Sequence, residues 1–376
     1  MLFYKPKIRL RQKKHTFNQQ TLQSWFPDLA MERIYPFFGS IGIIFIILGV
    51  LIMYGAMTID EFILDYTDCQ ELVYNNTPST PRNCSEVLNM NYTTKYQACT
   101  CKIEFHLTKS LKGQVYFYYY ISNFYSNHRR FFGSRDNHQL FGETRSLTKK
   151  CQPFSFKKIN DAYINYSPCG LIANSLFNDS FELSFTRNNV SIPVEMTSKG
   201  IAWKSDVDCK FGIPKSWNNT LKPVNWKYSP LERSNRSFKG DEEFLVWMRM
   251  SAFPMIKKLH RIINHNSDPF KLGLPTGVYG LLVKYAYPTA IFGGEKKVII
   301  STTNLLGGKN DNLGIMFITI GIIYEAIALL FFIFTFYDDE QKLRKLSYSG
   351  STSLIVPVDF VSPNVGVQLK PLKEDT

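Results

Sequence analysis

Two long apolar stretches lie near the two ends of this 376-residue chain. No charged residue occurs between Ile34 and Met57, and Glu325 is the only one between Leu313 and Tyr337. Each stretch exceeds the run of about 20 apolar residues that an α-helix needs to cross a hydrocarbon core of about 30 Å. The pattern therefore predicts two transmembrane helices, over residues 34–57 and 313–337.

The region between these stretches shows the period-two alternation of β-strands more often than the period of helices. Strands are expected over residues 115–121, 181–185, 279–285 and 298–303. The exception is the segment 243–263, where Trp247, Met248 and several basic residues recur at helical spacing around Pro254, which predicts an interrupted helix. The fold class expected is a membrane protein with two transmembrane α-helices and a large, mainly antiparallel β ectodomain that carries inserted helices and loops.

Basic residues flank both apolar stretches on the side of the chain ends. They are Lys5, Lys7, Arg9, Arg11, Lys13, Lys14 and Arg33 before the first stretch, and Lys342, Arg344 and Lys345 after the second. By the positive-inside rule both ends are cytosolic, and the middle region faces the secretory lumen or the cell exterior. The expected division is a cytosolic tail (1–33), a span (34–57), an ectodomain (58–312), a second span (313–337) and a cytosolic tail (338–376).

The first stretch could instead be a cleaved signal peptide. Its apolar region is too long for one, about 33 mostly polar residues precede it, and no small-residue cleavage motif follows before Asp60. We therefore expect a membrane anchor that is retained.

The formal charge of +13 would suit a protein that binds nucleic acid. The predicted topology puts most of the chain where no nucleic acid is expected, so this class is excluded. The basic run from Lys5 to Lys14 could instead touch anionic lipid headgroups. A disordered orientation signal is the other interpretation of that run.

Eight N-glycosylation sequons lie between the two stretches. We expect glycans on Asn75, Asn91, Asn178, Asn189, Asn218 and Asn235. Glycans are not expected on Asn83, whose sequon has Cys84 at its middle position, or on Asn165, whose sequon is followed directly by Pro168. The confinement of all eight to one region agrees with a lumenal placement.

All seven cysteines also lie in this middle region. In an oxidising compartment they are expected to form disulfides rather than to bind a metal, and an odd number leaves one thiol over. The six histidines do not cluster with the cysteines as zinc ligands would.

Signatures of phosphate-binding loops, zinc proteases and serine hydrolases are missing from the sequence. Two polar clusters could still suit catalysis: Asn127 to Arg130 with Ser134 to Asp136 close behind, and Asn174 to Asp179. In a glycosylated ectodomain such clusters more often hold loops together or bind a partner. We therefore expect no catalytic site, no metal and no cofactor.

These clusters resemble the motifs of one protein family. Residues 123–131, Asn-Phe-Tyr-Ser-Asn-His-Arg-Arg-Phe, are similar to the Asn-Phe-Tyr-x-Asn-His-Arg-Arg-Tyr block of the cell cycle control protein 50 family, also called the ligand-effect modulator 3 family. The likeness continues in order over residues 134–136, 168–180, 200–203, 223–226, 244–249, 285–288, 292–294, 301–303 and 307–310, and residues 17–27 resemble the family's entry into its first span. Met250-Ser251, Ala286 and the extra Cys209 depart from the family pattern.

The resemblance implies a function, because members of this family are non-catalytic beta subunits of phospholipid flippases, the type IV P-type ATPases. The chain would act as a chaperone and clamp in a heterodimer with the catalytic alpha subunit, in the endoplasmic reticulum, the Golgi or the plasma membrane. ATP hydrolysis and lipid selection would belong to the partner. The residues expected to contact it are Asn123, Phe124, Tyr125, Asn127, His128, Arg129, Arg130, Trp247, Arg249 and Glu325.

The resemblance also bears on the disulfides. The family's Cys-x-Pro and Pro-Cys-Gly arrangement implies a bond between Cys151 and Cys169. Among the other cysteines we expect the nested pairs Cys69–Cys101 and Cys84–Cys99, with Cys209 left free, although four cysteines allow three pairings.

Glu325 stands near the middle of the second apolar stretch, where an ionised side chain costs at least about 2.5 kcal/mol. On a helix it shares one stripe with Gly314, Ile318, Gly321 and Ala328. Small residues mark places where helices approach closely. We expect Glu325 to carry a proton, or to hydrogen-bond to Tyr54 or to a polar group of the ATPase; a tolerated acid that faces lipid or local water is the other interpretation.

Two further classes of protein remain open. A cell-surface receptor or adhesion ectodomain is disfavoured by the second span and by the lack of a sizeable cytosolic signalling domain. A lumenal membrane-bound enzyme that modifies lipid or sugar would keep its activity when purified alone.

Overall fold

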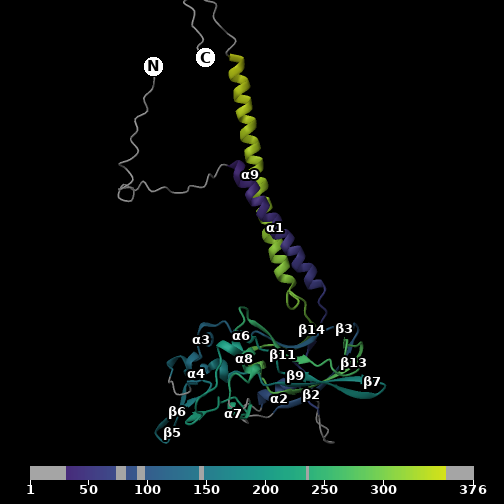
Figure 1. Ribbon diagram of the computed structural model, residues 1–376, viewed down its shortest axis with the longest axis vertical. Coiled ribbons are helices and arrows are strands. Elements are labelled where there is room, and N and C mark those ends of the chain that lie inside the picture. Colours follow the sequence, from purple (N-terminus) through teal and green to yellow (C-terminus); the bar gives the residue numbers. More distant parts are fainter. Residues whose placement is uncertain (1–30, 73–81, 91–97, 144–147, 234–236, 353–376) are drawn as a thin grey trace, which may run out of the picture. The chain divides into compact units, whose positions relative to one another are not determined.

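The computed structural model describes residues 31–72, 82–90, 98–143, 148–233 and 237–352 (Figure 1). The chain divides into two compact units, one made of residues up to Ile52 and from Asn312 onward, the other an ectodomain from Met53 to Asp311. The basic run 5–14 and the sequon asparagines Asn75, Asn91 and Asn235 lie outside the described residues.

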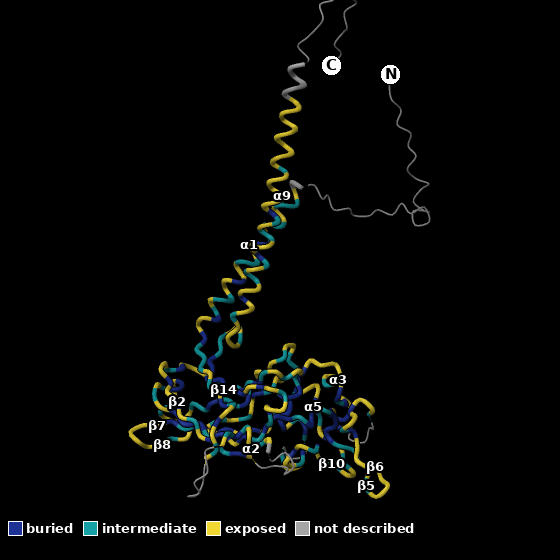
Figure 2. The backbone as a smooth tube through the Cα atoms, turned by 180° about the vertical axis from the view of Figure 1, so that it is seen from behind, coloured by how far each residue is buried: buried dark blue, intermediate teal, exposed yellow. Residues whose placement is uncertain are grey.

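Helix α1 (Met31–Met57) and helix α9 (Asp311–Thr352) contain the two apolar stretches. Both are long and apolar enough to cross a membrane. Exposed positions predominate along both helices (Figure 2), as they do on helices that face lipid. Together with the β ectodomain this confirms the predicted fold class of a two-span membrane protein. Helix α9 continues without a break past Tyr337, the predicted end of the span.

Small residues bring α1 and α9 into close contact within their unit. A Cβ atom placed on Gly42 would lie 3.0 Å from the carbonyl oxygen of Gly321, and one on Gly49 would lie 3.0 Å from that of Gly314. The predicted stripe of small residues on α9 therefore faces the other span, since only glycine allows backbones to approach this closely.

Two antiparallel sheets dominate the ectodomain. One has the strand order β1-β14-β4-β11-β9 and the other the order β2-β13-β7-β8. Their strands are β1 (Glu61–Asp65), β2 (Cys99–Leu107), β4 (Val115–Ser122), β7 (Ser180–Arg187), β8 (Val190–Val194), β9 (Met196–Thr197), β11 (Met255–Ile263), β13 (Gly277–Tyr285) and β14 (Lys296–Thr302). The four predicted strands correspond to β4, β7, β13 and β14 and are confirmed.

The hydrophobic core lies between these two sheets. Every second residue of β4, from Val115 to Ile121, is buried, as the period of a strand requires. Phe117 on β4 contacts Phe181 on β7 with ring centroids 5.2 Å apart, which joins one sheet to the other. Aromatic side chains thus take part in the contact between the two sheets.

Short elements complete the ectodomain. Strands β3 (Leu111–Lys112) and β12 (Gly273–Leu274) form a small sheet, and β5 (Phe156–Ile159), β6 (Ala162–Tyr166) and β10 (Thr220–Leu221) form another. The helices are α2 (Cys84–Met90), α3 (Arg129–Phe132), α4 (Asn137–Phe141), η2 (Lys149–Cys151), α5 (Leu171–Asn174), α6 (Lys204–Cys209), α7 (Pro230–Arg233), α8 (Glu242–Met248) and η3 (Ala290–Phe292).

The helix predicted over residues 243–263 is wrong beyond its first two turns. Helix α8 ends at Met248, and strand β11 begins at Met255, directly after Pro254. Strand β11 pairs with β4 on one side and β9 on the other, and Lys258 is one of its buried residues. A lysine at a core position breaks the apolar alternation by which a strand is recognised, so the helical interpretation prevailed.

The first and last strands of the ectodomain are neighbours. Strand β1 follows α1, strand β14 precedes α9, and Glu61 pairs with Ser301 in their antiparallel ladder. The backbone N–H of Asp60 also donates to the Thr302 hydroxyl at 3.1 Å, across 242 residues of sequence. The two segments that continue into the apolar helices are thus paired with each other at one edge of the sheet.

Candidate partner interface

The segment Asn123 to Arg130 leaves the end of β4 and leads into α3, and its first two residues attach it to the rest of the ectodomain. Asn123 has a left-handed backbone (φ 55°), and its side-chain amide donates to the carbonyl oxygen of Phe292. The Phe124 ring lies 5.4 Å from that of Phe131 and 5.7 Å from that of Trp247. These two residues therefore anchor the segment to the core.

The middle of the segment holds the loop that follows α8. The Asn127 side-chain amide donates to the carbonyl oxygen of Ala252 at 2.8 Å. The buried Ser126 hydroxyl accepts from the backbone N–H of Ser251 at 3.0 Å. These hydrogen bonds fix two loops that are about 125 residues apart in sequence.

Four side chains of the segment point into solvent. Tyr125 is 58% exposed, and His128, Arg129 and Arg130 are exposed as well. Among the described residues, none of the ion pairs includes Arg129 or Arg130. We call residues 125 and 128–130 the basic turn; its cations are available to an acidic partner.

The prediction that Trp247 contacts a partner is wrong. Its side chain is 1% exposed, and its indole N–H donates to the carbonyl oxygen of Ile172 at 2.8 Å. A buried tryptophan whose only polar group is satisfied inside the fold has a core role. It packs against Phe124 and so supports the basic turn from beneath.

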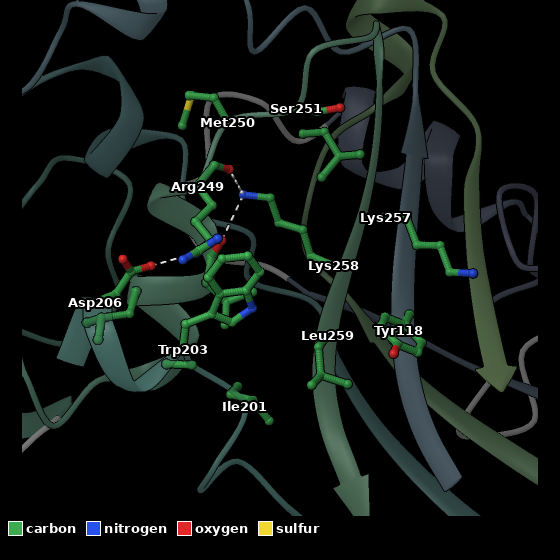
Figure 3. A pocket seen from close by; sticks show the side chains of 14 residues that line it. Tyr118, Ile201, Trp203, Asp206, Arg249, Met250, Ser251, Lys257, Lys258 and Leu259 are labelled. Atoms are coloured by element: carbon green, nitrogen blue, oxygen red, sulfur yellow. Dashed lines mark hydrogen bonds and ion pairs between the residues drawn. The ribbon is translucent and has the colours of Figure 1, made fainter. Parts of the chain in front are cut away.

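Arg249, the neighbouring predicted contact, is partly exposed beside a pocket of about 350 Å³ (Figure 3). Its guanidinium lies 3.3 Å from the centroid of the exposed Trp203 ring and 2.5 Å from the carboxylate of Asp206. Lys210 pairs with the same carboxylate at 2.7 Å. Burial raises the pKa of Asp206, but the hydrogen bonds from Lys210 and Arg249 outweigh this and lower it. The carboxylate thus orients Arg249 on a flat aromatic surface.

Lys258 reaches the same region from β11. Its ammonium group donates to the carbonyl oxygens of Val246 at 3.0 Å and Arg249 at 2.6 Å, and also to that of Trp247 (Figure 3). These carbonyls belong to the end of α8, where helical hydrogen bonding stops. Burial and the charge of Arg249 lower the pKa of Lys258 to about 7. Sequence reasoning missed this residue; a lysine within an otherwise apolar strand was the available signal.

The polar clusters that could have suggested catalysis have structural roles. Asp136 accepts hydrogen bonds from the backbone N–H groups of His138 and Gln139 and so caps α4. Ser134 accepts from the N–H of Leu171 at 2.9 Å, and Asn174 accepts from that of Asn225 at 3.2 Å. These hydrogen bonds hold the loops in place.

Asp179 ends the second cluster and lies at the centre of a buried network. It pairs with Lys296 at 2.7 Å, and both side chains are inaccessible to solvent. The carboxylate also accepts from the Tyr66 hydroxyl at 3.0 Å and from the N–H groups of Ala286 and Tyr287, each at 2.6 Å. Burial lowers the pKa of Lys296 to about 8 although Asp179 opposes the shift. The sequence offered no signal that these two residues meet, since 117 residues separate them.

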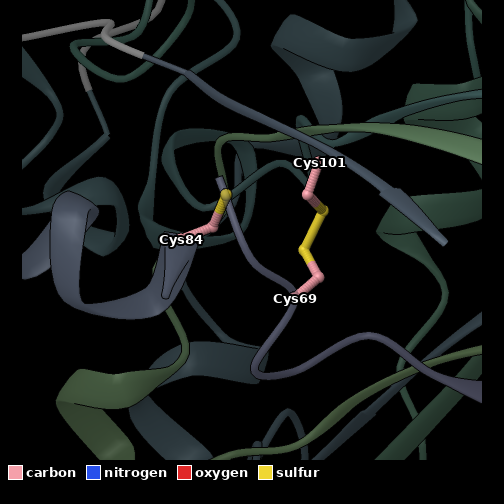
Figure 4. A group of neighbouring side chains, drawn as sticks. All are labelled: Cys69, Cys84 and Cys101. Atoms are coloured by element: carbon pink, nitrogen blue, oxygen red, sulfur yellow. A yellow bond between two sulfur atoms is a disulfide. The ribbon is translucent and has the colours of Figure 1, made fainter. Parts of the chain in front are cut away.

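Three disulfides lie in the ectodomain, Cys69–Cys101, Cys84–Cys99 and Cys151–Cys169, and they have the pairing expected above. Cys209 is exposed and unpaired. The sulfur atoms of Cys69, Cys84 and Cys101 lie within 4.8 Å of one another (Figure 4), a spacing that would suit a metal ion. All three are disulfide-bonded and therefore offer no thiolate.

The model of the LEM3 (ligand-effect modulator 3) family / CDC50 family matches residues 41–341. The chain belongs to the LEM3/CDC50 family. Cell cycle control protein 50A of Mus musculus is 40% identical over 332 residues, which cover 84% of this chain and 86% of that protein.

Two more distant relatives show how widely the CDC50 family extends. Cell cycle control protein 50B of Homo sapiens is 35% identical over 322 residues, 81% of this chain and 88% of that protein. Putative ALA-interacting subunit 4 of Arabidopsis thaliana is 33% identical over 326 residues, 84% of this chain and 87% of that protein. The family match runs from within α1 into α9, so it includes much of both apolar helices and the whole ectodomain between them.

The described sequons of this CDC50-family chain differ in accessibility. Asn178, Asn189 and Asn218 are exposed, whereas Asn83 and Asn165 are half-buried. Asn189 belongs to the turn between β7 and β8 and has a φ of 62°. The exposed asparagines are those for which glycans were expected.

Glu325 of this CDC50-family chain lies on the contact between α1 and α9. A Cβ atom on Gly42 would lie 2.6 Å from the Oε1 atom of Glu325. This oxygen is buried and has no hydrogen-bond partner among the described residues. Tyr54, which was expected to hydrogen-bond to Glu325, is 70% exposed, and that bond stays a prediction. The Oε1 atom of Glu325 is therefore buried against α1.

Proposed function

We propose that this chain is the accessory beta subunit of a phospholipid-translocating P-type ATPase. It would be needed for the folding of the catalytic subunit, for its exit from the endoplasmic reticulum, and for lipid flipping from the exoplasmic or lumenal leaflet to the cytosolic one. Membership of the CDC50 family over both helices and the ectodomain carries this proposal. The name of the plant relative, an interacting subunit, supports it.

The proposed topology has both termini in the cytosol. Residues 1–33 and 338–376 are cytosolic tails, residues 34–57 and 313–337 are the spans, and residues 58–312 are a glycosylated domain on the opposite side. Basic residues next to both spans support this orientation. The membrane would be that of the endoplasmic reticulum, the Golgi or the cell surface.

The ectodomain would act by binding, without chemistry of its own. Its polar clusters cap helices and join loops, while the basic turn and Arg249 beside Trp203 form exposed cationic surfaces. We propose that these surfaces contact the lumenal loops of the catalytic subunit, where acidic side chains would pair with them.

Affinity purification of the full chain from native membranes tests the proposal. A large P-type ATPase should co-purify in a stoichiometric amount. A preparation without an ATPase would favour the receptor or adhesion function, and lipid- or sugar-modifying activity of the chain alone would favour an enzyme.

Substitutions in the basic turn separate binding from folding. His128→Ala should lower the yield of the ATPase complex or its exit from the endoplasmic reticulum, with the ectodomain still folded, because His128 is exposed. Phe124→Ala is the comparison variant, because loss of its contacts to Phe131 and Trp247 should destabilise the ectodomain itself. Normal assembly of the His128 variant with loss of transport would instead assign that residue a direct part in the transport cycle.

Substitutions of Glu325 test whether the spans take part in assembly with the ATPase. We propose that its carboxyl group, which lacks a partner in the described chain, meets a polar group of the ATPase. Glu325→Leu should then weaken co-purification, while Glu325→Gln, which can still hydrogen-bond, should retain more of the complex. Unchanged or improved assembly of the leucine variant would refute this role.

A further inference from the structure

The turn between β14 and α9 exposes two leucines. Leu305 is fully exposed and Leu306 is 65% exposed. Each apolar square ångström left in water costs about 25 cal/mol, so two adjacent leucines at a loop tip are unfavourable unless something apolar meets them.

Local hydrogen bonds hold this tip in shape. Asn304 and Gly307 exchange two backbone hydrogen bonds of 3.0 Å, which close a two-residue hairpin. The Asn304 side-chain oxygen accepts from the N–H of Leu306 at 2.9 Å, and Gly307 has a φ of 104° that favours glycine. The leucines are therefore presented by a defined turn.

Asn304 also ties the hairpin to the end of α1. Its amide nitrogen donates to the carbonyl oxygen of Gly55 at 2.7 Å and to the Thr58 hydroxyl at 3.3 Å. The Leu306 side chain lies over Gly55, where a Cβ atom would come within 2.9 Å of it. Since Gly55 is in the last turn of α1, the hairpin is fixed beside the point where the first span ends.

The second span begins only a few residues after the hairpin. Three residues lie between Gly307 and Asp311, the first residue of α9, and the four steps of chain that join them reach at most about 14 Å. Lys309 and Asp311 pair at 3.8 Å. In the last turn of α1, Tyr54 and Met57 are 70% and 73% exposed, so apolar and aromatic side chains continue from the hairpin onto the span.

We infer that the hairpin from Asn304 to Gly307 inserts Leu305 and Leu306 into the interfacial region of the bilayer, in the leaflet on the ectodomain side. The occupant of this apolar tip is lipid, because the tip is continuous with the end of a membrane-spanning helix and is held there by Asn304. The inference is independent of the proposed function.

The test uses the full chain in lipid nanodiscs. A Cys209→Ser background removes the one cysteine outside the disulfides, and Leu305→Cys then carries an environment-sensitive fluorophore. Phospholipid with a nitroxide near its headgroup serves as the quencher. The control is Tyr163→Cys, because Tyr163 is 60% exposed on strand β6. Strands β5 and β6 lie at the end of the ectodomain away from β14 (Figures 1 and 2).

The nitroxide lipid should reduce the emission at position 305 by about twofold or more, as for a group that lies ~5–10 Å into the headgroup region, and leave the control unchanged. Asn304→Ala in the same background should weaken this quenching. A water-soluble quencher that acts equally at positions 305 and 163 would overturn the inference. Loss of lipid quenching when a catalytic subunit binds would assign the tip to a protein partner and overturn it too.

Discussion

Three cationic or basic side chains, Lys258, His260 and Lys296, are buried in the ectodomain, and each has different surroundings. Lys296 has a carboxylate and Lys258 has helix carbonyls, but the Nδ1 atom of His260 has no hydrogen-bond partner among the described residues. Aromatic rings surround this imidazole: Phe117, Tyr119, Phe177 and Phe181. Burial, assisted by the charge of Arg261, lowers the pKa of His260 to about 3.

Acid should therefore destabilise the ectodomain through His260. The unfolded chain binds a proton near pH 6.5 and the folded chain only near pH 3, so stability falls as the pH drops through this window, by up to about 1.4 kcal/mol per pH unit. His260→Phe keeps an aromatic ring and should reduce the loss between pH 6.5 and 5.0 by about 2 kcal/mol. Denaturant unfolding followed by tryptophan fluorescence measures this difference.

The two lysines do not confound that measurement, because they lose their protons at higher pH. Burial lowers the pKa of Lys258 to about 7 and that of Lys296 to about 8, both above the window. The same pH dependence in the wild-type chain and the His260 variant would contradict the assignment.

At this scale the sequence identified the right motif but not the direction of its side chains. Asn123 to Arg130 reads as one polar and aromatic block, yet Phe124 packs inward and His128 is exposed. Trp247 was expected at a surface and is buried. The direction depends on where β4 ends and on which loop packs beneath it, and both follow from contacts between residues that are 75 to 125 positions apart.

At the scale of elements, the end of α8 depends on a side chain from another element. Lys258→Met should lower the free energy of unfolding by about 1–3 kcal/mol, because it leaves buried carbonyl oxygens of Val246, Trp247 and Arg249 without their donor. Lys257→Met is the matched control on the same strand. It loses a partly exposed pair with Glu61, worth about 0–1 kcal/mol, and a cation–π contact with the Tyr118 ring, worth about 0.5–1 kcal/mol. If both variants lost the same free energy of unfolding at pH 6, Lys258 would not be a cap of α8.

The contact between the apolar helices gives a second prediction. Gly42→Ala should destabilise the contact between α1 and α9 by about 1–3 kcal/mol, because the added Cβ would lie 3.0 Å from the carbonyl oxygen of Gly321. Gly39→Ala should be tolerated, since its nearest neighbours lie 3.8 Å away. Thermal stability of the full chain in one detergent compares the two variants, and similar melting temperatures would refute a close contact at Gly42.

Elements with a clean period were predictable, and those governed by tertiary contacts were not. Strands β4 and β13 alternate apolar residues plainly and were found from sequence. Strand β11 carries Lys257, Lys258 and Arg261, and their spacing imitated a helix. The buried position of Lys258 is stabilised by α8, a neighbour that no local pattern reveals.

At the scale of the whole molecule, exposure gives a prediction for glycan occupancy. Asn178, Asn189 and Asn218 should carry glycans, because a transferase needs an accessible asparagine, and Asn83 and Asn165 should not. Glycopeptide mass spectrometry of the chain from a eukaryotic membrane tests each site. Occupancy of Asn165, whose side-chain oxygen is buried, would contradict the burial argument.

The pairing of β1 with β14 has a consequence for biosynthesis. The segment from Glu61 to Asp65 is made early, but its ladder partner from Lys297 to Ser301 is translated more than 200 residues later. Strand β1 and the side of β4 that β14 covers therefore stay unpaired, and open to chaperones that recognise unpaired strands, until nearly the whole ectodomain has been translocated. A chain truncated before Lys296 could not make these pairs, so formation of the β1–β14 ladder distinguishes a complete ectodomain from an incomplete one in the secretory pathway.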